Sequence, residues 1–238
     1  MSASCGQGVF VCLLECYYIL VKKILITFII LAVFFLIISI LVFINSPILE
    51  KIDSKIGKLL FVGNNTLFRE VSIFFTSIAD PIISTIIVVV LSVVSIMRKK
   101  KYDLYLIVIS SGLAIFLSSA IKFLFDKARP VQSLISEGTA SFPSNHSVIS
   151  AVLLCFLFYI ISDSIKNVYL KNIIKTLVFF VFVFIPLTRI MLGAHFTSDV
   201  LAGFGLGLAM YIFTGMLLSV LTGGKADCDV CLKEKNVL

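Results

Sequence analysis

Six long apolar runs, separated by shorter polar segments, dominate the chain. They cover residues 24–44, 78–97, 104–125, 144–161, 172–191 and 200–220. A helix needs about 20 apolar residues to cross a membrane, and each run approaches that length. Inside lipid a helix satisfies its own backbone hydrogen bonds, whereas an open strand leaves them unpaired. The pattern therefore predicts an all-α, polytopic membrane protein with six transmembrane helices in a bundle.

The polar ends of the chain divide it into three parts. We expect a cytoplasmic or interfacial N-terminal segment at 1–23, a six-helix membrane domain at 24–222 and a cytoplasmic tail at 223–238. The composition agrees with this division, because 60% of the residues are hydrophobic and 14% are charged. Soluble domains are roughly half apolar and a quarter charged.

The first long connection, 45–77, has a pattern of its own. Apolar residues recur there at helical spacing with Lys and Asp between them, namely Leu49, Ile52, Ile56, Leu59 and Leu60. This spacing is typical of a helix with one apolar face that lies along the membrane surface. We expect an interfacial amphipathic helix in this first outer loop.

Basic residues indicate how the chain is oriented. Segments on the N-terminal side of the membrane hold 12 of the 20 Lys and Arg residues, with the densest group, RKKK, at 98–101. Cytoplasmic loops are enriched in such residues, so we expect both termini in the cytoplasm and the protein in the plasma or inner membrane. The net charge of +7 fits lysines that face anionic lipids. Without a basic stripe, a nucleic-acid partner is not expected.

Three polar clusters interrupt the apolar pattern, and all lie on the predicted outer side. They are KFLFDKARP at 122–130, FPSNHS at 142–147 and TRIMLGAHFTSD at 188–199. Both histidines of the chain fall within them. Ionisable residues at the ends of membrane spans are candidates for function, because they are costly there. We therefore expect the clusters to form one site on the extracytoplasmic side.

The first two clusters carry groups that bind anions. Lys122 and Arg129 are seven residues apart, so they would share a face if the helix continued between them. Ser144 stands where a helix is expected to start, and the free N–H groups of a helix start bind anions. His146 adds a side chain that can donate a proton. Each feature alone also fits a snorkelling lysine or a simple helix cap.

The third cluster supplies a histidine and a carboxylate four residues apart. His195 and Asp199 would share a face in a helix, and a carboxylate fixes the tautomer of a neighbouring imidazole. Arg189 adds another cation. Together the clusters describe a phosphate site, in which cations and N–H groups neutralise the anion while one histidine attacks and the other protonates the leaving oxygen.

In this order, the three motifs resemble the signature of the type 2 phosphatidic acid phosphatase superfamily. The signature reads Lys-x6-Arg-Pro, then Pro-Ser-x-His, then Ser/Thr-Arg-x5-His-x3-Asp. It is matched here by Lys122, Arg129, Pro130, Pro143, Ser144, His146, Arg189, His195 and Asp199. Asn145 replaces a frequent glycine and Thr188 a usual serine. Both differences leave every charged and nucleophilic group in place, so they bear on substrate preference more than on activity.

The resemblance implies a metal-independent lipid phosphatase without a cofactor. It assigns the attack on phosphorus to His195, its orientation to Asp199, and protonation of the leaving group to His146. It assigns phosphate binding to Lys122, Arg129, Ser144 and Arg189, and structural roles within the motifs to Pro130, Pro143 and Asn145. The expected substrates are lipid phosphates of the surrounding membrane: phosphatidic acid, phosphatidylglycerophosphate or undecaprenyl pyrophosphate. No obligatory protein partner is expected.

Two alternatives stay open at this stage. A lipid phosphotransferase of the same family would use the same phosphohistidine with an alcohol in place of water. A thiol-redox membrane protein, or a zinc site joining the two ends of the chain, would instead use the pairs Cys12/Cys16 and Cys228/Cys231. We expect these cysteines in the cytoplasm, where thiols stay reduced.

Overall fold

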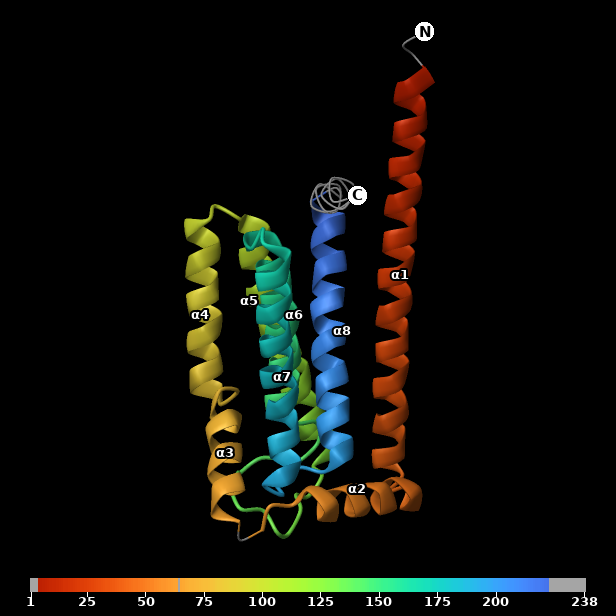
Figure 1. Cartoon of the computed structure of the whole chain (residues 1–238). Coiled ribbons are helices and arrows are strands. Elements are labelled where there is room, and N and C mark those ends of the chain that lie inside the picture. Colours follow the sequence, from red (N-terminus) through yellow and green to blue (C-terminus); the bar gives the residue numbers. More distant parts are fainter. Residues whose placement is uncertain (1–3, 64, 223–238) are drawn as a thin grey trace.

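A computed structural model of the chain describes residues 4–63 and 65–222, with side chains from residue 21 onward. Every regular element in these ranges is a helix (Figure 1). The elements are α1 (Ser4–Phe43), α2 (Pro47–Leu60), α3 (Thr66–Ser77), α4 (Pro81–Met97), α5 (Lys101–Phe125), α6 (Asn145–Ser164), α7 (Val168–Met191) and α8 (Thr197–Leu221). The prediction of an all-α membrane bundle is confirmed.

Five of the helices are long and apolar enough to cross a membrane on their own, and the sixth span is broken. Helices α3 and α4 qualify only as a pair, bent by 44° at the residues between them. Asp80 causes the break, because its carboxylate caps the N–H of Ile82 while Pro81 starts the new helix. The expected span at 78–97 was therefore too short, since the pair begins at Thr66, inside the predicted outer loop.

The first span is part of a longer helix. Helix α1 runs for 40 residues without interruption, so most of the N-terminal segment 1–23 continues the helix of the span. At about 1.5 Å per residue this is about twice the thickness of the hydrocarbon core. The location of the N-terminal segment 1–23 in the cytoplasm or at the membrane interface stays a prediction. The tail at 223–238 and its cysteines lie outside the described residues, as do the side chains of Cys12 and Cys16.

Helix α6 forms the centre of the bundle and α1 its edge. In the most apolar stretch of α6, 56% of the residues are buried within the protein, against 11% in α1. Glycines bring α8 close to α6: a Cβ added at Gly203 would lie 2.6 Å from the carbonyl oxygen of Ser144. Small residues of α8 thus allow close helix packing. The contact also ties the start of α6 to the first turns of α8.

Helix α2 is the expected amphipathic helix, and it lies across one end of the bundle (Figure 1). Ile48 and Leu59 are largely exposed and suit a membrane surface, whereas Asp53 on the opposite side is buried. The C-terminal ends of α5 and α7 and the N-terminal ends of α6 and α8 meet at this same end (Figure 1). All three polar clusters of the sequence therefore converge next to α2.

Candidate active site

His195 lies in the short turn between α7 and α8 and is only 2% exposed. Gly193 makes this turn possible, because its φ of +65° is a left-handed conformation that a glycine adopts without strain. Burial lowers the pKa of His195 to about 3, although the negative charge of Asp199 opposes the shift. The imidazole is therefore neutral at pH 7, which is the form that can attack phosphorus.

The neighbours of the His195 ring select one tautomer. Nη1 of Arg129 lies 3.1 Å from Nε2, and a guanidinium can only donate, so Nε2 is the unprotonated nitrogen whose lone pair accepts this hydrogen bond. Nδ1 then carries the proton and lies 3.4 Å from the Ser141 hydroxyl oxygen. The nitrogen with nucleophilic character thus faces the arginine.

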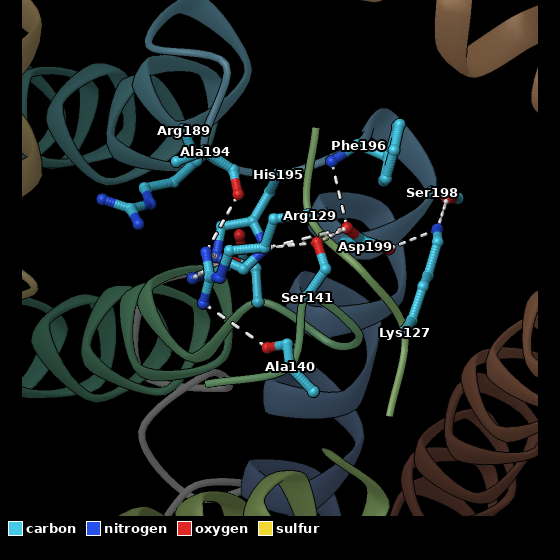
Figure 2. Close-up of polar contacts among 12 residues, drawn as sticks. Lys127, Arg129, Ala140, Ser141, Arg189, Ala194, His195, Phe196, Ser198 and Asp199 are labelled. Atoms are coloured by element: carbon cyan, nitrogen blue, oxygen red, sulfur yellow. Dashed lines mark hydrogen bonds and ion pairs between the residues drawn. The ribbon is translucent and has the colours of Figure 1, made fainter. Parts of the chain in front are cut away.

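Asp199 acts on His195 through an intervening serine (Figure 2). The Ser141 hydroxyl donates to Oδ2 of Asp199 at 2.5 Å, whereas that oxygen is 3.7 Å from Nδ1 of His195. Lys127 pairs with the other carboxylate oxygen at 2.7 Å, and the backbone N–H of Phe196 donates to Oδ2. The sequence brought His195 and Asp199 together correctly, but it did not indicate Ser141 between them.

Arg129 reaches the site from a loop and not from a helix. Helix α5 ends at Phe125, because Asp126 adopts a left-handed conformation with a φ of 40°. The side chain of Arg129 is then held by the carbonyl oxygens of Thr139, at 2.8 Å, and Ala194, at 2.9 Å. The shared helical face considered for Lys122 and Arg129 does not form, yet both residues arrive at the same end of the bundle.

A carboxylate of the chain occupies the space between the two arginines. Arg129 pairs with Oε2 of Glu137 at 2.6 Å, and Arg189 pairs with Oε1 of the same residue. Arg189 is almost fully buried and also donates to the hydroxyl of Thr76 at 3.0 Å. Oε2 of Glu137 lies 3.9 Å from Nε2 of His195. Sequence reasoning missed Glu137, whose only signal was an acidic residue alone between two basic motifs.

Lys122, Ser144 and His146 complete the site on the side of α5 and α6. The ammonium group of Lys122 donates to the carbonyl oxygen of Ala140 at 2.5 Å. Ser144 is the N-cap residue of α6, and its backbone N–H donates to the carbonyl oxygen of Asp199 at 3.1 Å. His146 follows in the first turn of α6 and is half-buried.

Asn145, which departs from the motif, has a packing role in this structure. Its side-chain oxygen accepts a hydrogen bond of 2.5 Å from the hydroxyl of Ser118 on α5. A glycine at this position would lack that bond between α5 and the start of α6. Pro143, just before the cap, is buried, whereas Pro130 is half-buried in the loop after Arg129.

Comparison with known proteins places this geometry in a family. Residues 103–220 match the PAP2 superfamily, and all three motifs lie within that range. The chain belongs to the PAP2 superfamily. A PAP2 relative, phosphatidylglycerophosphatase B of Bacillus subtilis, is 26% identical over 183 residues, which are 75% of this chain and 88% of the relative. A PA-phosphatase related-family protein of Dictyostelium discoideum is 36% identical over 93 residues, which are 36% of this chain and 34% of that protein.

Two solved structures share the helical arrangement. The crystal structure of the Bacillus subtilis transmembrane PAP2 phosphatidylglycerolphosphate phosphatase matches with a TM-score of 0.72 and 23% identity, covering 80% of this chain and 95% of that one. LpxE of Aquifex aeolicus matches with a TM-score of 0.54 and 18% identity, covering 67% and 92%. At these identities the likeness establishes the fold alone.

Proposed function

We propose that this membrane PAP2 protein hydrolyses the terminal phosphate of lipid phosphates through a phosphohistidine on His195, without a metal ion. The position of Glu137 carries the proposal. An anionic group there is held by two guanidinium groups next to Nε2, the unprotonated nitrogen of His195. A phosphoryl group at the same place would lie next to the nucleophile His195 and between the positive charges of Arg129 and Arg189.

The proposed reaction has two steps. Nε2 of His195 attacks phosphorus, the bond to the lipid oxygen breaks, and His146 gives that oxygen a proton. The neutral His146 then takes a proton from water, whose oxygen attacks phosphorus, so that the P–N bond breaks and phosphate leaves. Asp199, through Ser141, stabilises the positive charge that develops on His195 during attack.

In this proposal, basic side chains of the protein neutralise the phosphate, as a metal ion does in other phosphatases. Arg129 and Arg189 already hold an anion, and Lys122 projects toward the same loop at Ala140. Ser144 adds the start of α6, where unpaired N–H groups favour negative charge. This set of donors supports the proposal that neither a metal nor another cofactor is needed.

The location of the site fits a lipid substrate. It lies at the end of the bundle beside α2, so a headgroup can reach the cations while the acyl chains stay in the membrane (Figure 1). We place this end on the extracytoplasmic side of the plasma or inner membrane. Among the expected substrates, the name of the Bacillus subtilis relative favours phosphatidylglycerophosphate as the first to assay.

The first prediction concerns the nucleophile. Reconstituted protein should release phosphate from purified phosphatidylglycerophosphate, phosphatidic acid or undecaprenyl pyrophosphate in the presence of a chelator. His195→Ala should reduce the rate by more than the factor of roughly 10²–10³ that is typical for the loss of one phosphate donor. The measurement is colorimetric phosphate release with Arg69→Ala, a change on the exposed face of α3, as the control.

Two outcomes would contradict this prediction in different ways. Activity that disappears with the chelator would show that the reaction needs a metal. Equal rates for the wild type and His195→Ala would remove His195 from the role of nucleophile. Transfer of phosphate to an added alcohol in preference to water would identify a phosphotransferase instead.

A further inference from the structure

The N-cap residue of helix α8 has no side chain that can accept from the N–H groups of the first turn. This N-cap residue is Phe196, whose ring cannot accept a hydrogen bond, yet the first turn of α8 carries Asp199. Asp53 on α2 supplies the missing acceptor from far away in the sequence. The N–H of Ser198 donates to Oδ1 of Asp53 at 2.8 Å, and the Ser198 hydroxyl donates to Oδ2 at 2.6 Å. One buried carboxylate thus holds both donors of a single residue.

The same carboxylate belongs to a charge cluster with Lys127. The ammonium group of Lys127 lies 2.7 Å from Asp199, 3.2 Å from the Ser198 hydroxyl and 3.9 Å from Oδ2 of Asp53. Lys127 therefore serves two carboxylates, of which Asp53 is 5% exposed and Asp199 is fully buried. If Asp53 lost its charge, its pull on the ammonium would disappear, and the ammonium would be drawn closer to Asp199.

That redistribution matters because Asp199 must stabilise a positive charge on His195. A carboxylate that is more completely neutralised by Lys127 exerts a weaker field at the imidazole. The charged groups around His195 are otherwise Arg129 and Glu137 from the loop and Arg189 from α7. None of these touches Asp53, so the influence of Asp53 on the nucleophile runs through Lys127 and the first turn of α8.

We propose that Asp53 is a positioning residue for the nucleophile, acting through Ser198 and Lys127 on Asp199. The proposal rests on the proposed phosphatase function and adds to it. By this arrangement α2 is more than a membrane-surface helix, since it fixes the turn of α8 that carries the catalytic carboxylate. The phosphate-binding residues are outside the contacts of Asp53, so its effect falls on the attack step and not on substrate affinity.

Two variants separate the charge of Asp53 from its hydrogen bonds. Asp53→Asn keeps groups that can bond to Ser198 but removes the charge, whereas Ser198→Ala keeps the charge and removes the hydroxyl bond. Glu50→Gln is the matched control, because Glu50 is one helical turn away on α2, is exposed, and lines the same cavity of about 500 Å³ beside Asp53. A change at Glu50 removes an equal charge without a contact to α8.

The measurement is a single-turnover assay with enzyme in excess over lipid phosphate, together with steady-state KM. The single-turnover rate constant does not depend on the folded fraction, so a merely structural loss would leave it unchanged. We expect Asp53→Asn and Ser198→Ala to lower this constant by roughly 10- to 100-fold, as for other residues that orient a catalytic group. KM should stay at the wild-type value, and Glu50→Gln should behave as the wild type.

The outcomes distinguish this proposal from the proposed function. If the wild type hydrolyses no lipid phosphate, the proposed function itself fails. If the wild type is active and the rate constants of both variants equal that of Glu50→Gln, only the role of Asp53 is overturned. A loss that appears in KM alone also overturns it. Should Asp53→Asn not fold, Ser198→Ala decides, since an unchanged rate constant for that variant is the contrary result.

Discussion

Glu137 determines the resting state of the residues that would bind phosphate. Its carboxylate pairs with Arg129 and Arg189 at the position where the proposed reaction needs the phosphoryl group. A phosphate monoester brings up to two negative charges and three terminal oxygens, so it competes well with one carboxylate. The competition still lowers the apparent affinity, because only the fraction of molecules with an open site can bind. At the scale of single residues, we therefore predict that the internal anion Glu137 limits the affinity for a lipid phosphate.

A substitution at Glu137 should therefore improve substrate binding. Glu137→Gln keeps the size of the side chain but removes the charge that holds it between the arginines. We expect KM for the lipid phosphate and the inhibition constant for inorganic phosphate to fall by about 10-fold, which corresponds to about 1.4 kcal/mol. Both constants can be measured by phosphate release. Glu70→Gln on the exposed side of α3 is the control, and a KM above the wild-type value would contradict the expectation.

From the sequence, only those residues of the site could be predicted that belong to a motif with a characteristic spacing. His195, Asp199 and Arg189 were recognised together because their spacing forms one motif, and the structure places them at one end of the bundle. Ser141, Glu137 and Asp53 gave no such signal, since each is an isolated polar residue whose partner lies on another element. Tertiary folding alone brings them to the site.

At the scale of elements, the contact between α6 and α8 sets the geometry of the site. Gly203 and Gly207 lie one turn apart on α8 and face the backbone of α6 at Ser144 and Val148. The same stretch of α6 begins with the cap that faces the carbonyl oxygen of Asp199. Any separation of the two helices would therefore also move the cap of α6 away from Asp199.

Adding one methyl group in this contact should be costly. In Gly207→Ala the new Cβ would lie 2.2 Å from the carbonyl oxygen of Val148, which is helix backbone and cannot move alone. Overpacking costs about 1–3 kcal/mol, more than the gain of about 1 kcal/mol for replacing a helical glycine by alanine. We expect a lower Tm in detergent and lower phosphatase activity.

Gly215→Ala provides the comparison within the same helix. The atom nearest to its Cβ would be the Tyr102 hydroxyl at 3.8 Å, which is an ordinary contact. Only the gain in helix propensity applies there, so its Tm should equal or exceed that of the wild type. A Tm for Gly207→Ala as high as that of Gly215→Ala would show that α6 and α8 can separate without cost.

The sequence predicted five of the six spans as elements, but not the break in the second. Hydropathy measures how apolar a segment is, but it contains no information on the direction of the helix axis. The hydropathy pattern therefore could not indicate the 44° bend between α3 and α4. The local signal was Asp80 followed by Pro81, a cap and a helix start in adjacent positions. Helix α3 has 12 residues, too few for a span by itself, and was assigned to the loop.

At the scale of the whole molecule, the site and the two described ends of the chain lie at opposite ends of the bundle. Helix α1 begins and α8 ends away from α2, on the side where the turn between α4 and α5 lies (Figure 1). That turn is part of the basic segment 98–101, and its Arg98 and Lys100 pair with Asp163 at the end of α6. From the positive-inside rule we predict that this end lies in the cytoplasm and the site on the outer side.

Cysteine labelling in intact cells tests this orientation directly. The six native cysteines would first be replaced by serine, and a single cysteine introduced as Ser136→Cys in the exposed loop beside the site or as Lys101→Cys at the other end. A membrane-impermeant maleimide should label the first variant in intact cells and the second only after permeabilisation. Both positions are exposed, so a difference in labelling reflects the side of the membrane and not burial. Labelling of Lys101→Cys alone would place the site in the cytoplasm, where only lipids of the inner leaflet could reach His195.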